Sequence, residues 1–125
     1  MKIEVSIGEI VDKLTILDIK MSQIFNPEKL KNIVKEFGYL KDVVENELNI
    51  STESEDYKKL LNINKELWDI EDKIRDKERN NSFDYEFIEL ARLVYITNDK
   101  RADIKKEINL KFGSNFLEEK SYSKY

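Results

Sequence analysis

The apolar residues of this chain recur every three to four positions over long stretches, which is the spacing of amphipathic helices. The first stretch follows Ser6 and Glu9, which form a capping box, and predicts a helix of about five turns. Its apolar stripe consists of Ile7, Ile10, Leu14, Leu17, Met21 and Ile24. Asn26 and Pro27 then end this helix and begin the next one, because asparagine caps helices and proline suits the first helical position.

The second predicted helix also has one apolar face, and the short connection before it requires the first two helices to lie antiparallel. Its stripe consists of Leu30, Ile33, Val34, Phe37, Leu40, Val44 and Leu48. Residues 49–56 form a polar linker in which Thr52 and Glu55 have the spacing of another capping box. We therefore expect a third helix over residues 53–80.

The fourth predicted helix begins after the capping residue Asp84 and ends at Gly113, since glycine suits the left-handed position after a helix. It has two usable faces. One is apolar: Phe87, Leu90, Val94, Ile104 and Ile108. The other is small and polar in its centre: Ile88, Ala91, Tyr95, Asn98, Ala102, Lys105, Asn109 and Phe112. Small residues permit close approach, so we expect the second face to meet another helix or a ligand.

These elements predict an all-α fold, an antiparallel bundle of four helices in a single domain over residues 1–125. Only three Gly and one Pro occur in 125 residues, which also favours long helices over a many-stranded protein. We expect a short extended segment at residues 2–5 and a loose tail at residues 121–125. The chain has no apolar run long enough to cross a membrane and no secretory signal pattern, so we expect a cytoplasmic protein.

Composition excludes several kinds of chemistry. The chain has no Cys and no His, which excludes disulfides, thiolate zinc sites, cysteine nucleophiles and an imidazole base. The net charge is −4 and neither half of the chain is basic, so nucleic acid is not an expected partner. We expect no cofactor and no catalytic residue.

Polar residues at two apolar-seam positions of the third helix, Asn64 and Glu71, indicate a candidate site. In an antiparallel hairpin that turns near Ser82, Asn64 lies opposite Arg101, and Glu71 lies near Tyr95. Arginine is scarce in this lysine-rich chain and supplies the bidentate recognition that lysine lacks. The candidate site residues are Glu71, Arg75, Arg92, Tyr95, Asn98 and Arg101.

Two interpretations of this polar layer remain open. It can be a pocket for an anionic group, bound by arginine, asparagine and tyrosine. It can instead be a buried hydrogen-bonded network that fixes the helix register, which is the interpretation we expect. The buried network predicts that Arg75→Ala leaves Glu71 as an unpaired buried charge.

Acidic residues at helical spacing raise the alternative of a Mg²⁺ or Mn²⁺ site, as in helical nucleotide pyrophosphohydrolases. These groups are Glu9 with Asp12, Glu66 with Asp69 and Asp72, and Glu86 with Glu89. A chain with 26 acidic residues produces such groups by chance, so we expect solvated surface and no metal site. We also expect the basic residues between 100 and 111 to form a solvated face, because acidic residues interrupt them.

Three segments carry a resemblance to a known family. They are residues 5–17, residues 67–75, and a set towards the end that includes Leu90, Arg92, Tyr95, Asn98, Arg101, Asn109 and Gly113. The chain resembles a small uncharacterised family of bacterial and phage helical proteins, a domain of unknown function. The resemblance implies no reaction, ligand or cofactor. It does imply that residues 118–122 are more than a frayed end.

The function that we expect from the sequence is a non-enzymatic helical interaction module that forms homodimers. Its basis is apolar surface beyond the stripes, which an isologous dimer would bury. This surface consists of Ile16 and Ile19 on the first helix, Ile63 and Ile70 on the third, and the second face of the fourth helix. The alternative is a small helical enzyme or binder of a phosphorylated metabolite that uses Arg75, Arg92 and Arg101, with or without a divalent metal. The partner would then be a small anionic ligand instead of a second copy or another protein.

Overall fold

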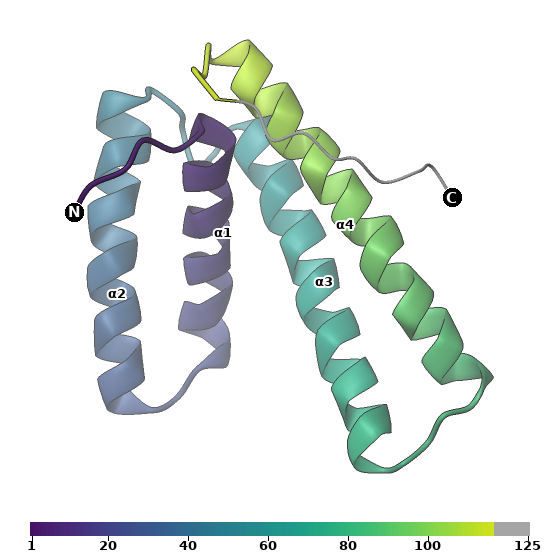
Figure 1. Cartoon of the computed structure of the whole chain (residues 1–125). Helices are drawn as coiled ribbons and strands as arrows, with labels where there is room; N and C mark the ends of the chain where they lie inside the picture. The colour runs from purple at the N-terminus through teal and green to yellow at the C-terminus, as the bar shows by residue number, and fades with distance from the viewer. Residues whose placement is uncertain (117–125) are drawn as a thin grey trace.

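The structure is a computed structural model that describes residues 1–116, and Figure 1 shows its four α-helices. They are α1 (Ile7–Gln23), α2 (Pro27–Asp42), α3 (Glu55–Arg79) and α4 (Tyr85–Lys111), with a π-helical turn η1 (Val43–Glu47) directly after α2. The predicted all-α fold is confirmed, and the described part of the chain contains no strand, so residues 2–5 add none. The predicted tail at residues 121–125, like residues 118–122, lies outside the described residues.

Three of the four helix starts follow the predicted caps. The Ser6 hydroxyl accepts the Glu9 backbone N–H at 3.2 Å, and Asp84 accepts the Phe87 backbone N–H at 3.0 Å. The Asn26 side chain accepts two backbone N–H groups at the start of α2, each at 3.1 Å. These local hydrogen bonds satisfy donors that a helix leaves unpaired in its first turn.

The start of α3 differs from the prediction. Thr52 does not cap this helix; Ser54 does, and its hydroxyl accepts the Tyr57 backbone N–H at 3.3 Å. The helix therefore begins at Glu55 instead of residue 53, because the turn before it is held by Ser51. At the other end of the chain, Gly113 has a φ of 69°, as predicted for the residue that ends the fourth helix.

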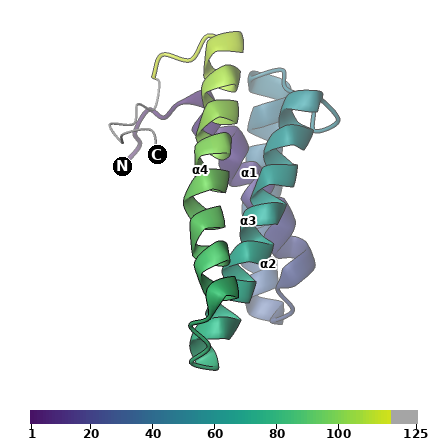
Figure 2. The ribbon, with the colours of Figure 1, turned by 90° about the vertical axis from the view of Figure 1, so that its right-hand side faces the viewer.

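The helices form two antiparallel hairpins, α1 with α2 and α3 with α4, which meet at one end of the molecule and diverge towards the other (Figure 1). At the meeting end, α1 packs against both α3 and α4. The view turned by 90° shows α3 and α4 side by side along their lengths (Figure 2). The bundle is therefore an open one, joined at its apex.

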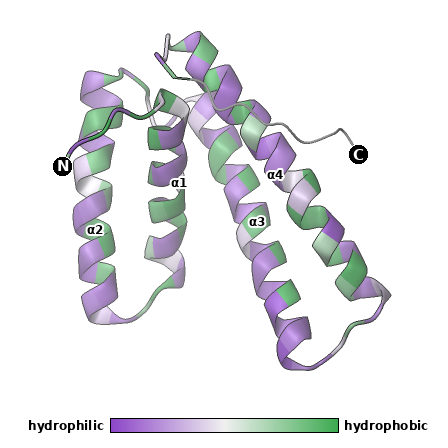
Figure 3. Cartoon of the chain, in the orientation of Figure 1, coloured by the Kyte–Doolittle hydropathy of each residue, from purple (hydrophilic) through white to green (hydrophobic). Residues whose placement is uncertain are grey.

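The main cluster of buried apolar residues lies at this apex. Its members are Val11, Leu14, Val44, Ile50, Tyr57, Leu60, Ile63 and Ile108. By contrast, α2 contains no buried residue, and α3 contains none beyond Leu67. We call the diverging halves of the two hairpins the arms. Figure 3 shows apolar positions along the arms as well as at the apex. The diverging halves of the two hairpins thus carry apolar residues that this fold leaves only partly covered.

Two of the residues expected to form surplus apolar surface belong to the core instead. Ile19 and Ile63 are buried, because α1 and α3 pack against each other where we expected them to face a partner. Ile16 and Ile70 are half-buried. The prediction of free apolar surface at Ile19 and Ile63 is therefore wrong.

The C-terminal part of the small and polar face of α4 meets α1, whereas Ile88 and Tyr95 on the same face are exposed. The Gly8 backbone N–H donates to Asn109 Oδ1 at 2.6 Å, and the Ile7 N–H donates to Ser114 Oγ at 3.1 Å. Lys105 is also buried, with its Nζ 2.8 Å from Glu9 Oε2. Lys105 was expected on a solvated basic face; that prediction is wrong, because the first turn of α1 covers this side chain.

A buried tyrosine joins α3 to α1. The Tyr57 hydroxyl donates to Asp18 Oδ2 at 3.0 Å, and burial together with the nearby Asp18 carboxylate raises the pKa of Tyr57 well above its usual value near 10. The folded protein therefore keeps this phenol neutral at a pH where the unfolded chain ionises it. Its contribution to stability is complete below pH 10 and is lost as the pH rises above that value.

We expect this phenol to be visible in alkaline unfolding. Above about pH 10 the free energy of unfolding of the wild type should fall more steeply than that of Tyr57→Phe, by about 1.4 kcal/mol per pH unit. Denaturant melts of both proteins between pH 8 and 11 measure the difference. Parallel slopes above pH 10 would show that Tyr57 ionises equally in both states.

Candidate functional site

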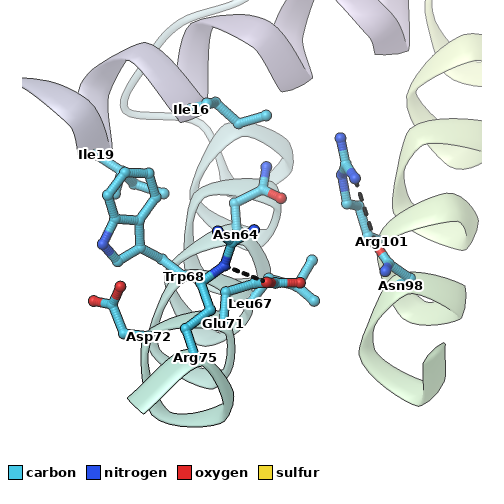
Figure 4. A pocket seen from close by; sticks show the side chains of 10 residues that line it. All are labelled: Ile16, Ile19, Asn64, Leu67, Trp68, Glu71, Asp72, Arg75, Asn98 and Arg101. Carbon is cyan, nitrogen blue, oxygen red and sulfur yellow. Dashed lines mark hydrogen bonds and ion pairs between the residues drawn. The ribbon is translucent and has the colours of Figure 1, made fainter. Parts of the chain in front are cut away.

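A groove of about 540 Å³ lies between the two hairpins, where α1 and the α3–α4 pair begin to diverge (Figure 4). Its lining residues come from α1 (Ile16, Ile19), from α3 (Asn64, Leu67, Trp68, Glu71, Asp72, Arg75) and from α4 (Asn98, Arg101). The lining is apolar at Ile16, Ile19, Leu67 and the Trp68 ring, and charged farther along α3. It is the kind of mixed surface that receives a protein segment or a small organic ligand.

The inner end of the groove rests on a buried polar network. Asp12 is 2% exposed, and its carboxylate accepts hydrogen bonds from both Nε and Nη2 of Arg101, the former at 2.9 Å. Asn64 Nδ2 donates to Asp12 Oδ1 at 2.9 Å and to Thr15 Oγ1 at 2.8 Å. The network therefore joins α1, α3 and α4 at the point where the hairpins separate.

Arg101 stands between this network and the groove. Its side chain is 27% exposed, and its Nη1 donates to Asn98 Oδ1 at 3.4 Å, as Figure 4 shows. Asp12 neutralises the guanidinium in a bidentate ion pair that is largely removed from water. Arg101 thus acts mainly as the cationic half of a structural pair, with one edge towards the groove.

The structure brings together four of the six predicted site residues. Asn98 and Arg101 line the groove from α4, and Glu71 and Arg75 line it from α3. The expected closeness of Asn64 and Arg101 is also found, since both bind the carboxylate of Asp12.

Arg92 and Tyr95 are not among the lining residues. Both are exposed on α4, where a hydrogen bond to Tyr95 raises the pKa of the Arg92 guanidinium. The six residues therefore do not form one cluster.

Glu71 and Arg75 do not form the buried network that we expected. Arg75 Nε lies 3.3 Å from Glu71 Oε2, but the side chains are 73% and 46% exposed, respectively. Exposed pairs at this spacing contribute only about 0.3–0.5 kcal/mol. The buried-network interpretation is wrong for this pair, because α1 diverges from α3 towards this part of the groove (Figure 1).

The residue at the centre of the real network, Asp12, was missed as a site residue. The sequence offered a signal: Gly8, Asp12 and Thr15 follow one another at helical spacing beside the apolar stripe. Such a small and polar face on α1 complements the small and polar face on α4. Asp12 was instead grouped with Glu9 as a pair of acidic residues at the spacing of a metal site. Glu9 forms an ion pair with Lys105.

The acidic groups do not assemble a metal centre in the part of the chain that the structure describes. No group of three or more acidic side chains there has the arrangement needed to hold a metal ion. No described helix is both long and apolar enough to cross a lipid bilayer.

Comparison with known proteins gives one match. The sequence model of a family of unknown function, DUF6165, matches residues 1–125. No curated protein and no solved structure matches the chain.

Proposed function

The chain belongs to the family of unknown function DUF6165, and we propose that it is a non-enzymatic helical module that self-associates through the groove between its hairpins. The observation that supports this is the unfinished packing of the arms. Buried apolar residues are concentrated at the apex, while the diverging halves of α3 and α4 contribute only Leu67, Leu90 and Thr97 to the buried set. A second copy would cover the apolar residues that these halves leave partly exposed.

The apolar side chains on the arms support the same proposal. Within α4, Ile88 and Leu93 are exposed, and Phe83 is 56% exposed at the turn before it. Trp68, in the groove, is half-buried. These side chains belong to the α3–α4 hairpin, which also supplies eight of the ten residues that line the groove. Isologous dimers are the commonest assembly that covers such a surface.

The groove suits a protein segment better than a phosphorylated metabolite. Two arginines line it, but Glu71 and Asp72 line it as well, so its lining carries no net positive charge. The charge of Arg101 is committed to Asp12 and that of Arg75 to Glu71, while Arg92 lies elsewhere on α4. Strong phosphate sites instead offer guanidinium groups that no carboxylate has already neutralised.

Light scattering on a size-exclusion column tests the proposal. We expect the measured mass to rise from the monomer value of 14.9 kDa towards twice that value as the loading concentration increases. Trp68→Ala should shift this rise to higher concentration, because it removes the largest apolar side chain of the groove. A mass that stays at 14.9 kDa at every concentration would contradict self-association.

A further inference from the structure

Glu71 and Arg75 form the outer part of the groove on α3, with opposite charges one helical turn apart. Both side chains point into the open space of the groove in Figure 4 and come from the same face of the helix. Their mutual ion pair of 3.3 Å is exposed and therefore weak, so it can be exchanged for a better one at little cost.

An acid and a base at this spacing are self-complementary under a two-fold axis. If two copies of α3 cross antiparallel with the axis midway between these residues, Glu71 of each copy faces Arg75 of the other. Two intermolecular ion pairs then replace two intramolecular ones, and both lie inside a contact that excludes water, where they are stronger.

We propose that the groove is an isologous interface in which the α3 helices of two copies cross antiparallel, held in register by exchanged Glu71–Arg75 ion pairs. This inference rests on the proposed self-association and specifies its geometry. It assigns to Glu71 and Arg75 a role in selecting the partner. Both side chains are exposed in the single chain and are therefore accessible to a second copy.

The same register gives the exposed tip of the arm a place to bind. Pairing position 71 with position 75 sets position 79 opposite position 67, so the α3–α4 turn of one copy reaches the level of Leu67 and Trp68 in the other. Phe83 at this turn is exposed, and its ring packs edge-on against that of Phe87, with the ring centroids 5.2 Å apart. The apolar part of the groove therefore faces an exposed aromatic ring.

Charge reversal tests the register. We expect Glu71→Arg alone and Arg75→Glu alone to weaken self-association at least about tenfold, because each places like charges across the two-fold axis. An equimolar mixture of the two variants should recover dimers, since each copy then carries the charges that the other lacks. Size-exclusion chromatography with light scattering measures all three samples, and circular dichroism checks that each variant keeps its helix content.

Lys41 and Glu45 provide the matched control. They have the same spacing and opposite charges on the other hairpin, 3.7 Å apart, and neither lines the groove. Lys41→Glu should leave the dimer unchanged.

The outcomes separate the two proposals. A wild type that stays monomeric overturns both the self-association and this register. A wild type that dimerises while Glu71→Arg and Arg75→Glu dimerise equally well overturns the register alone. The register is also overturned if the single variants are monomeric and their mixture forms no dimers. The two charges would then not face each other across the two-fold axis.

Discussion

Arg101→Met should lower the free energy of unfolding by about 3–5 kcal/mol, the usual cost of leaving one partner of a buried ion pair alone. The substitution leaves the carboxylate of Asp12, which is 2% exposed, with Asn64 and no cation. Denaturant melts at neutral pH measure the effect. Because a small domain has only about 5–15 kcal/mol of stability in total, this loss should be visible without elaborate analysis.

A second variant distinguishes the charge from the packing. Replacing both residues, Asp12→Leu with Arg101→Met, should cost clearly less than Arg101→Met alone, since no charge remains buried. Arg75→Ala is the control for an exposed arginine and should cost no more than about 0.5 kcal/mol. If Arg101→Met were as mild as Arg75→Ala, the Asp12–Arg101 pair would not hold the apex together.

Gly8→Ala should destabilise the protein by about 2–3 kcal/mol, although alanine normally favours a helix. A Cβ atom at Gly8 would lie 2.6 Å from the backbone carbonyl oxygen of Lys105 and 3.0 Å from Asn109 Oδ1. The backbone of α4 cannot move without disturbing the hydrogen bond between Asn109 and the Gly8 N–H. Thermal or denaturant melts give the change in stability.

Gly38 provides the matched control within the same chain. It lies within α2, and a Cβ atom there would meet nothing within 4 Å. Gly38→Ala should therefore stabilise the protein by up to about 1 kcal/mol, through helix propensity alone. Stabilisation by both substitutions would mean that α1 and α4 do not approach each other as closely as the structure shows.

The sequence predicted the helices well because helix starts depend on neighbouring residues. Ser6, Asn26 and Asp84 each bind backbone N–H groups two or three residues away, so their roles are visible in the local pattern. The closeness of Asn64 and Arg101 was also predictable, since a hairpin with a short turn fixes which residues lie opposite each other.

The extent of burial was not predictable, because it depends on how strongly two helices diverge. Asn64 of α3 binds Asp12 and Thr15 of α1, so the two helices lie close together at this point. Glu71 occupies a seam position two turns farther along α3 and is 46% exposed, because the hairpins have separated there (Figure 1). The periodicity of α3 gave its apolar face and could not give the distance to the helices around it.

The angle between the two hairpins could not be predicted from the pattern of apolar residues. An apolar stripe shows which face of a helix is apolar and does not show which other helix covers it. For this reason Ile19 and Ile63 were predicted at the surface and belong to the interior.

The central claim, that the groove is the surface through which two copies associate, can be tested with the fluorescence of Trp68, the single tryptophan of the chain. This residue lines the groove and is half-buried in the isolated chain. Dilution across the range in which light scattering reports a change in mass should shift its emission to longer wavelength, in parallel with the mass, as water returns to the groove. A mass that changes with concentration while the Trp68 emission stays constant would place the interface elsewhere and contradict the claim.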